Sequence, residues 1–204
     1  MPACALSPDL IRRAVELHGH WCPGLALGIR AAEWALAELG GSVDEEVVAV
    51  VETDMCAVDA VQALVGCTLG KGNLLHRDYG KRAFSFYRRR DGRAARLLAR
   101  PGALGEAGET LARLQEKRQE GGLTPSEEAL WSETRDQASR AILEGDLETL
   151  FEVGAPLEPL PAPARIAPSL SCASCGEPVM VGRLLRSEGR DLCIPCARGQ
   201  GSAS

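Results

Sequence analysis

The sequence has few aromatic residues, few lysines and no long apolar run. Aromatic residues make up 4% of its 204 residues, and only three of its 23 basic residues are lysines (Lys71, Lys81 and Lys117). No apolar stretch approaches the roughly 18–20 residues that cross a membrane, and the N-terminus lacks a basic segment followed by an apolar one. We therefore expect neither a membrane segment nor a secretory leader, and we expect the protein in the cytoplasm.

An excess of positive charge is also absent. The formal net charge is −5, so the chain has no general attraction for nucleic acid or for anionic membrane surfaces. Residues 154–204 contain no lysine and no aromatic side chain on which a base could stack. These absences argue against a nucleic-acid partner.

Several helices have clear start signals. Ser7 followed by Pro8 is an N-cap and first-turn pattern, and Thr124 followed by Pro125 and Glu127 is a capping box with a first-turn proline. Apolar residues recur at helical spacing after Pro8 and after Pro23. The expected helices are 8–18, 23–40, 55–65, 105–119, 125–144 and 146–153.

Strands are expected as well. The run 47–52 is β-branched and typical of a buried strand. Asp91-Gly92 predicts a hairpin turn between strands 83–90 and 93–99, and a glycine-rich loop is expected at 66–80. The fold class is therefore α+β: a mixed core of helices and a small sheet, then a helical segment and a C-terminal four-cysteine module. The expected boundaries are a core at 1–153, a proline-rich linker at 154–169, the cysteine module at 170–198 and a disordered tail at 199–204.

The most specific motif is a double cysteine pair near the C-terminus. Cys172-x2-Cys175 is followed, after seventeen residues, by Cys193-x2-Cys196. Two residues between cysteines allow one tight turn to direct both sulfurs at one point, and a short hairpin can return the second pair to complete a tetrahedron. The pattern predicts a structural zinc ribbon, in which four sulfurs saturate Zn and leave no position for a substrate.

A second group of metal-capable side chains lies in the first half of the chain. His18, His20 and Cys22 fall within five residues, in the expected turn between two helices. Cys22 precedes the helix that Pro23 opens, and Cys56 follows a strand at the start of another helix. Backbone N–H groups and the helix dipole favour a thiolate at such positions.

These two thiols and the two histidines are expected to converge on one transition metal, such as zinc, iron or nickel. Fewer than four protein ligands would leave a coordination position open for catalysis. The alternative interpretation is that His18 caps the first helix and that Cys22 and Cys56 are small buried apolar residues.

The loop 66–74 contributes two more candidates. Lys71 can place a cation beside an anionic substrate or lower the pKa of a neighbouring thiol. Cys67 follows a helix C-terminus, where the dipole disfavours a thiolate, so it ranks below Cys22 and Cys56. The loop does not match a phosphate-binding P-loop, because Lys71 is followed by Gly72 instead of serine or threonine.

Three acidic residues lie near Cys56 in the sequence. Glu52 and Asp54 are candidates to orient a histidine from behind. Asp59 is interpreted as a first-turn helix acid.

Four linked segments together resemble the FmdE family, which takes its name from a component of formylmethanofuran dehydrogenase. The resemblance covers about residues 10–90. Its segments are His18-Gly-His-x-Cys-Pro-Gly-Leu-Ala-Leu-Gly, Cys56-Ala-Val-Asp-Ala-Val-Gln, Gly66-Cys-Thr-Leu-Gly-Lys-Gly-Asn-Leu and Asp78-Tyr-Gly-Lys-Arg-Ala-Phe-Ser-Phe.

The resemblance implies an α+β core of FmdE type, a homodimer, a metal-capable cleft and often a C-terminal zinc ribbon. It also implies an accessory or associated role beside a molybdenum or tungsten oxidoreductase acting on formylmethanofuran or formate, because nothing in the chain resembles a pterin-binding fold. Matching the motifs assigns the core metal site to His18, His20, Cys22, Cys56 and Cys67. The same matching makes His20, Cys22, Cys56 and Lys71 the candidates for chemistry.

Two other functions stay open at this point. Cys22 and Cys56 can form a reversible disulfide in a thiol-redox protein, although the core lacks the Cys-x-x-Cys of a thioredoxin-type mechanism. The zinc ribbon can instead serve as a docking adaptor for another protein. Whether the protein is itself an enzyme is not determined by these patterns.

Overall fold

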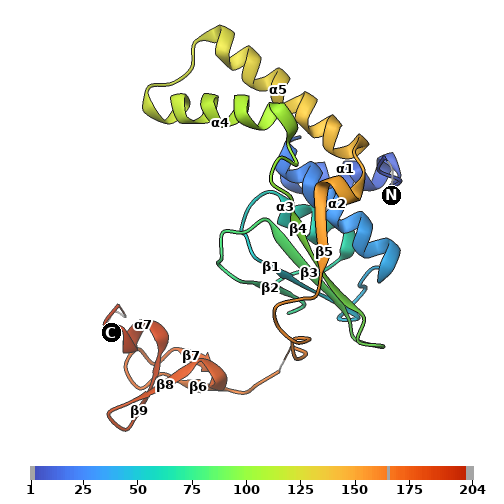
Figure 1. Cartoon of the computed structure of the whole chain (residues 1–204). Helices are drawn as coiled ribbons and strands as arrows, with labels where there is room; N and C mark the ends of the chain where they lie inside the picture. Colours follow the sequence, from blue (N-terminus) through green and yellow to red (C-terminus); the bar gives the residue numbers. More distant parts are fainter. Residues whose placement is uncertain (1–2, 165, 201–204) are drawn as a thin grey trace. The chain divides into compact units, whose positions relative to one another are not determined.

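The computed structural model describes residues 3–164 and 166–200, and its elements are labelled in Figure 1. The chain divides into two compact units, one ending at Pro163 and the other beginning at Ala164. Each unit is described by itself. The first holds helices and one sheet and the second holds two short hairpins, so the predicted α+β class is confirmed.

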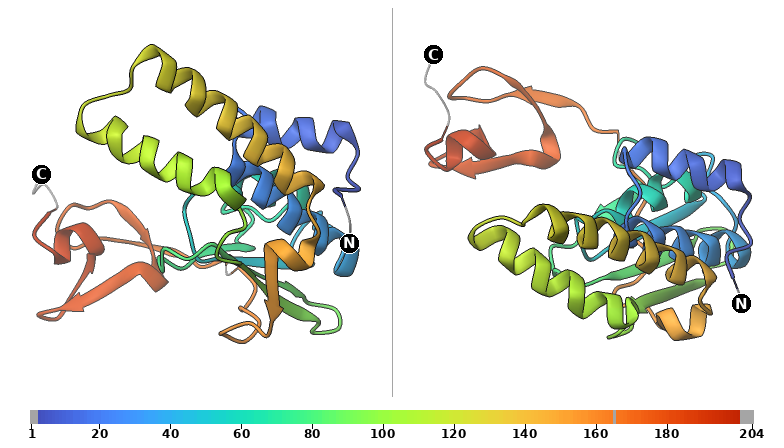
Figure 2. Two further views of the ribbon diagram at one scale, coloured as in Figure 1. Left: turned by 45° about the horizontal axis from the view of Figure 1, so that its top comes forward. Right: turned by 90° about the horizontal axis from the view of Figure 1, so that it is seen from above.

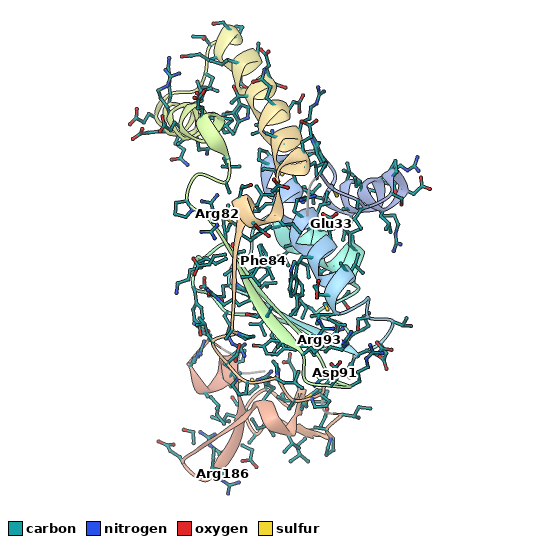
Figure 3. All side chains as sticks on the ribbon, turned by 45° about the vertical axis from the view of Figure 1, so that its right-hand side comes forward. Glu33, Arg82, Phe84, Asp91, Arg93 and Arg186 are labelled. Carbon is teal, nitrogen blue, oxygen red and sulfur yellow. The ribbon has the colours of Figure 1, made fainter. Side chains whose placement is uncertain are left out.

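A five-stranded sheet organises the first unit, with the strand order β2-β1-β3-β4-β5. β1 and β2 are parallel, whereas the other neighbouring strands are antiparallel. The predicted hairpin joins β3 and β4, and Figure 3 shows Asp91 and Arg93 at its turn. The strands are β1 (Val47–Val51), β2 (Leu74–His76), β3 (Ala83–Arg88), β4 (Ala94–Ala99) and β5 (Phe151–Gly154).

Helices cover one face of this sheet (Figures 1 and 2). They are α1 (Pro8–His18), α2 (Pro23–Glu38) and α3 (Ala57–Ala60), which continues as a π-helical turn (Val61–Val65). α2 is almost entirely buried and packs with the inward side chains of the sheet, such as Phe84 and Phe86. A Cβ atom at Gly28 would lie 2.3 Å from the carbonyl oxygen of Ala57, so only glycine allows α2 and α3 to approach this closely.

The opposite face of the sheet is covered by an extended segment of the chain. Val48, Val50 and Tyr87 are buried there. The Tyr87 hydroxyl donates a 2.8 Å hydrogen bond to the carbonyl of Glu158, and Arg89 donates one of 2.7 Å to the carbonyl of Pro161. The first half of the expected linker is therefore docked on the sheet.

α4 (Gly105–Glu120) and α5 (Pro125–Glu144) form an antiparallel hairpin that projects from the core (Figures 1 and 2). The predicted capping box at Thr124 begins α5: its side chain accepts from the Glu127 N–H, and the Glu127 carboxylate accepts from the Thr124 N–H. Lys117 pairs with Glu127 across the hairpin, and the Arg118 guanidinium lies 4.7 Å from the ring centre of Trp131. Charge pairing at the tip and cation–π contact below it hold the two helices together.

Two expectations for secondary structure are wrong. The helix expected at 146–153 stops after α6 (Leu147–Leu150), because Phe151 pairs with Ala99 in the sheet ladder and is 1% exposed. The glycine-rich loop contains an unpredicted strand, β2, which pairs with β1 and buries Leu74. In both places, burial of a large apolar side chain beside a strand outweighs the local pattern.

No helix of the described residues is long and apolar enough to cross a membrane. The predicted tail at 199–204 lies outside the described residues from position 201 onward. Gly199 and Gln200 are described, and their N–H groups donate to the carbonyls of Cys196 and Pro195.

Candidate metal centres

The turn between α1 and α2 brings its polar side chains together through local backbone signals. The Ser7 side chain caps α1, and Gly19, with φ of 88°, ends it in the left-handed region. Cys22 is the N-cap of α2, and its sulfur accepts a 3.3 Å hydrogen bond from the Leu25 N–H. The predicted place of Cys22 at a helix N-terminus is thereby confirmed.

Within this turn, donor atoms of His18, His20 and Cys22 all lie within 4.8 Å of one another. The His18 Nε2 atom is 3.7 Å from the Cys22 sulfur, and the centres of the two imidazole rings are 4.4 Å apart. Cys22 is buried and His18 half-buried, whereas His20 is exposed. The cluster therefore opens to solvent on the His20 side.

Asp59 supports this cluster from behind. Its Oδ2 atom lies 2.7 Å from the Nδ1 atom of His18, and its Oδ1 atom accepts a hydrogen bond from Gln62. A carboxylate on Nδ1 fixes the ring so that Nε2 is free for a metal. Sequence reasoning assigned this role to Glu52 or Asp54, and only the spacing Cys56-x2-Asp59 within one helical turn could have pointed to Asp59.

The prediction that Glu52 orients a histidine is wrong. Its buried carboxylate forms a two-point ion pair with Arg96, at 2.6 and 2.8 Å. Glu52 and Arg96 lie on the helix-free side of the sheet, because the side chains of a strand alternate between faces. Asp54 is exposed.

Cys56 stands next to Cys22. A Cβ atom built on Gly24 would lie 3.6 Å from the Cys56 sulfur and 3.9 Å from the Cys22 sulfur. Partial burial, and then the neighbouring Cys22, raise the pKa of Cys56. Cys56 is the N-cap residue of α3, but its side chain makes no capping hydrogen bond, so desolvation is the larger influence on its pKa.

The pKa of His20 shifts downward, in contrast to that of Cys56. Partial desolvation, together with the nearby His18 and Arg135, lowers the pKa of His20 and so favours its neutral form. Arg135 comes from α5, and its guanidinium also donates a 3.3 Å hydrogen bond to the carbonyl of Trp21. A neutral imidazole is the form that binds a metal.

Cys67 and Lys71 have other partners in the structure. The fully buried Cys67 thiol donates to the carbonyl of Val47 at 3.4 Å, and burial raises the pKa of Cys67 to about 12. The Lys71 ammonium donates to the carbonyls of Ser42 and Val43, both at 3.3 Å. Both side chains therefore hold the segment that leads into β1, and neither is among the donor atoms gathered around His18.

A large surface hollow lies elsewhere in the first unit. It has a volume of about 930 Å³ and is lined by residues around the C-terminal end of α2, including Leu36, Leu39 and Arg89. The Cys22 cap is at the N-terminal end of the same helix, and 16 residues of helix extend about 24 Å. The hollow is thus separate from the histidine–cysteine cluster.

The second unit forms a four-cysteine cluster. The sulfurs of Cys172, Cys175, Cys193 and Cys196 lie within 4.8 Å of one another. The Cys172 sulfur accepts hydrogen bonds from the N–H groups of Cys193 and Ser174 at 3.3 and 3.4 Å. Such donors, those of Cys193 first, lower the pKa of Cys172 to about 6, so the backbone is arranged for a thiolate.

Short hairpins build this cluster. The elements are β6 (Ser169–Ser171), β7 (Pro178–Met180), a 3-10 turn (Val181–Arg183), β8 (Leu184–Ser187), β9 (Arg190–Cys193) and α7 (Ile194–Ala197). The first cysteine pair spans the turn after β6, whereas Cys193 ends β9 and caps α7 by accepting from the Cys196 N–H. Four convergent sulfurs fit zinc, which takes tetrahedral thiolate sites.

Comparison with known proteins gives two family matches. The model described as "FmdE, Molybdenum formylmethanofuran dehydrogenase operon" matches residues 17–152. The model described as "Prokaryotic dksA/traR C4-type zinc finger" matches residues 165–200. The two matches fall on the two parts of the chain that hold the metal-capable clusters.

Two individual proteins are also similar. A protein of Archaeoglobus fulgidus named "Probable S-adenosyl-L-methionine-binding protein" is 34% identical over an alignment of 202 residues that covers 92% of this chain and 52% of that protein. This chain therefore spans about half the length of that relative. The crystal structure of an FmdE-like protein from Syntrophus aciditrophicus, described as related to tungsten formylmethanofuran dehydrogenase, has the same fold, with a TM-score of 0.59 and 22% identity over 99% of this chain and all of that one.

Proposed function

Because this chain belongs to the FmdE family, whose model covers most of the first unit, we propose that its core binds a transition metal through His18, His20 and Cys22. The observation that carries the proposal is the convergence of these three donor atoms within 4.8 Å. Asp59 behind His18 supplies the outer-shell partner that metal-binding histidines commonly have. The protein thus combines a core metal site with a C4 zinc finger.

The donor set limits the choice of metal. Imidazole and thiolate suit zinc, iron, nickel or copper, whereas magnesium and calcium prefer oxygen. Three protein ligands leave one tetrahedral position, toward which either Cys56 or a molecule from solvent can turn. When bound, the metal would supply Lewis-acid character at the exposed side of the cluster, where His20 lies.

We further propose that the protein is accessory to a molybdenum or tungsten oxidoreductase of the formylmethanofuran or formate type, as a cytoplasmic homodimer. The family description, which refers to the molybdenum formylmethanofuran dehydrogenase operon, supports such an association. The S-adenosyl-L-methionine named for the Archaeoglobus protein is not assigned to this chain, because about half of that relative lies outside the match.

Protein docking through the zinc ribbon is a second candidate function. Four large apolar side chains of this small unit are 42–51% exposed: Leu170, Met180, Val181 and Leu185. Exposed apolar side chains can contribute to protein docking. Co-purification of the oxidoreductase with the full chain, but not with a Leu170→Ser, Met180→Ser variant, would support docking through these side chains.

Metal analysis by mass spectrometry tests the core site. We expect two metal ions per chain in the wild-type protein, and one in His20→Ala and in Cys22→Ser, since the ribbon keeps its zinc. The matched control is His76→Ala, which changes an exposed histidine at the end of β2 and is expected to retain both ions. Unchanged metal content in both His20→Ala and Cys22→Ser would overturn the proposal.

A further inference from the structure

The spacing of Cys22, Gly24 and Cys56 carries an inference beyond metal binding. A Cβ atom on Gly24 would lie within 4 Å of both sulfurs and 3.2 Å from the Cβ atom of Cys56. A side chain at position 24 would therefore crowd both cysteines. With glycine there, the two sulfurs border the same small space.

The backbone does not explain this glycine. Gly24 is not among the glycines with positive φ, and it lies in the first turn of α2, where glycine lowers helix stability relative to alanine. A Cβ atom at this position would instead press on the Cys56 side chain, at 3.2 Å from its Cβ atom. Glycine therefore leaves the space beside both cysteines open.

The two cysteines differ in how firmly they are held. Cys22 is 5% exposed, and its sulfur is fixed by the Leu25 N–H. Cys56 is half-buried, and its side chain makes no capping hydrogen bond. Cys56 is therefore the thiol that is more accessible to a reagent from solvent. Cys22 is the more buried thiol, and it would react second.

We propose that Cys22 and Cys56 form a reversible disulfide that removes the Cys22 thiolate from the metal site, so that metal occupancy depends on the thiol redox state. The inference rests on the proposed core metal site. A thiolate is the metal-binding form of cysteine, and a disulfide sulfur no longer carries its charge. Oxidation would then release the metal, and reduction would restore the site.

The oxidant is a small-molecule disulfide. Cys56 first loses its proton, and its sulfur then attacks one sulfur of the reagent, forms a mixed disulfide and releases the first small thiolate. The Cys22 thiolate then attacks the Cys56 sulfur, which forms the intramolecular bond and releases the second thiolate. Both cysteine protons end on the released thiols, so one disulfide is reduced while one is formed.

The other cysteine of this region, Cys67, offers the matched control. It is fully buried, and its thiol donates to the Val47 carbonyl. Trypsin would place Cys22 in the peptide 14–30 and both Cys56 and Cys67 in the peptide 31–71. Variants must therefore distinguish the last two.

The experiment treats the reduced full chain with cystamine, with and without bound zinc, and identifies cross-linked peptides by mass spectrometry without reduction. We expect the 14–30/31–71 cross-link in wild type and in Cys67→Ala, its loss in Cys56→Ser, and at least a tenfold fall in core metal occupancy when it forms. Dithiothreitol should restore the occupancy. Preloaded zinc should slow the cross-link.

Three results would overturn this inference and leave the proposed metal site intact. The first is no cross-link in protein that binds the core metal, and the second is a cross-link that forms while the metal stays bound. The third is a cross-link that survives in Cys56→Ser but not in Cys67→Ala. If the reduced protein holds no metal outside the ribbon, the proposed core function fails, and the metal-coupled switch fails with it.

Discussion

His18 and His20 are separated by one glycine, yet they have different surroundings. The Nδ1 atom of His18 faces the Asp59 carboxylate at 2.7 Å, and its other nitrogen faces the Cys22 sulfur. His20 is exposed and has no comparable partner among the described residues. The first ring is therefore fixed before a metal arrives, whereas the second can adjust to it.

This difference makes Asp59 a position to test. Asp59→Asn keeps the size of the side chain but removes the charged acceptor that orients His18. We expect core metal affinity to fall by about 10- to 100-fold, the usual cost of losing an outer-shell partner. Competition with a fluorescent zinc chelator measures the change.

The control for this variant is Asp54→Asn, which changes an exposed carboxylate five residues earlier. It is expected to bind metal like the wild type. Equal affinities for Asp59→Asn and wild type would show that the carboxylate does not support the site.

At the scale of elements, the loop 66–74 braces the start of the sheet. The buried Asn73 side chain donates to Ser42, to the carbonyl of Asp44 and to the carbonyl of Val47, and it accepts from the Thr68 N–H. A Cβ atom on Gly66 would lie 2.3 Å from the Ser42 carbonyl oxygen. The loop therefore holds the segment 42–47 tightly, and this contact requires glycine.

Lys71 belongs to the same brace, and this leads to a prediction. Lys71→Met removes two hydrogen bonds to the carbonyls of Ser42 and Val43. We expect the free energy of unfolding to fall by about 1 kcal/mol, with core metal affinity unchanged. Urea unfolding measures the stability, and chelator competition measures the metal affinity. A large loss of metal affinity without a loss of stability would show that Lys71 takes part in the core metal site.

Arg88 connects the β3–β4 hairpin to the end of α2, beside a second pair between Arg93 and Glu38. Arg88 donates to the carbonyls of Glu38 and Leu39 and forms a two-point pair with Asp91, at 3.0 and 2.6 Å. A cation at a helix C-terminus also complements the negative end of the dipole. Asp91 thus keeps Arg88 in position for the helix.

This pair predicts a dependence of stability on pH. Arg88 lowers the pKa of Asp91 from 3.8 to about 2. A depressed carboxylate pKa contributes stability that is present above pH 3.8 and is lost as the pH falls toward 2. Asp91→Asn should therefore have a lower free energy of unfolding than the wild type at pH 5. Near pH 2.5 the difference between the two proteins should be smaller, because the wild-type carboxylate is then partly protonated.

Tryptophan fluorescence during urea unfolding measures this effect, because all three tryptophans lie in the first unit (Trp21, Trp34 and Trp131). Loss of zinc from the ribbon in acid therefore does not change the tryptophan fluorescence directly. A constant gap between the two proteins across this pH range would contradict the assigned pairing.

At the scale of the whole molecule, the chain consists of two units with different sources of stability. The first has a large apolar core between the sheet and its helices, whereas the described apolar cluster of the second is small and includes its cysteines. A unit of that size depends on its metal to fold. Metal removal should therefore affect the two units separately.

Cys175→Ser tests this independence. We expect loss of the ribbon zinc and unfolding of residues 170–198, since structural zinc contributes on the order of 10 kcal/mol to the folding of such modules. The helical signal in circular dichroism should stay close to that of the wild type, because the long helices lie in the first unit. A global loss of helical signal would show that the core depends on the ribbon.

Much of the fold follows from short stretches of sequence. The caps at Ser7 and Thr124 and the turn at Asp91-Gly92 act through neighbouring residues, so they are visible without tertiary structure. The spacing of the ribbon cysteines predicted a zinc finger for the same reason, and the family match agrees. The strand β5 was missed because Phe151 gains its stability from a distant strand.

The sequence by itself predicted the fold class, the four-cysteine cluster and the turn that carries His18, His20 and Cys22, because caps, turns and cysteine pairs are patterns of residues within a few positions of one another. Only the tertiary structure decided that Asp59, 41 residues away, faces His18 and that Lys71 faces a loop 28 residues before it. Contacts of that kind depend on how helices and strands pack, and no local pattern encodes which carboxylate or carbonyl a side chain will meet.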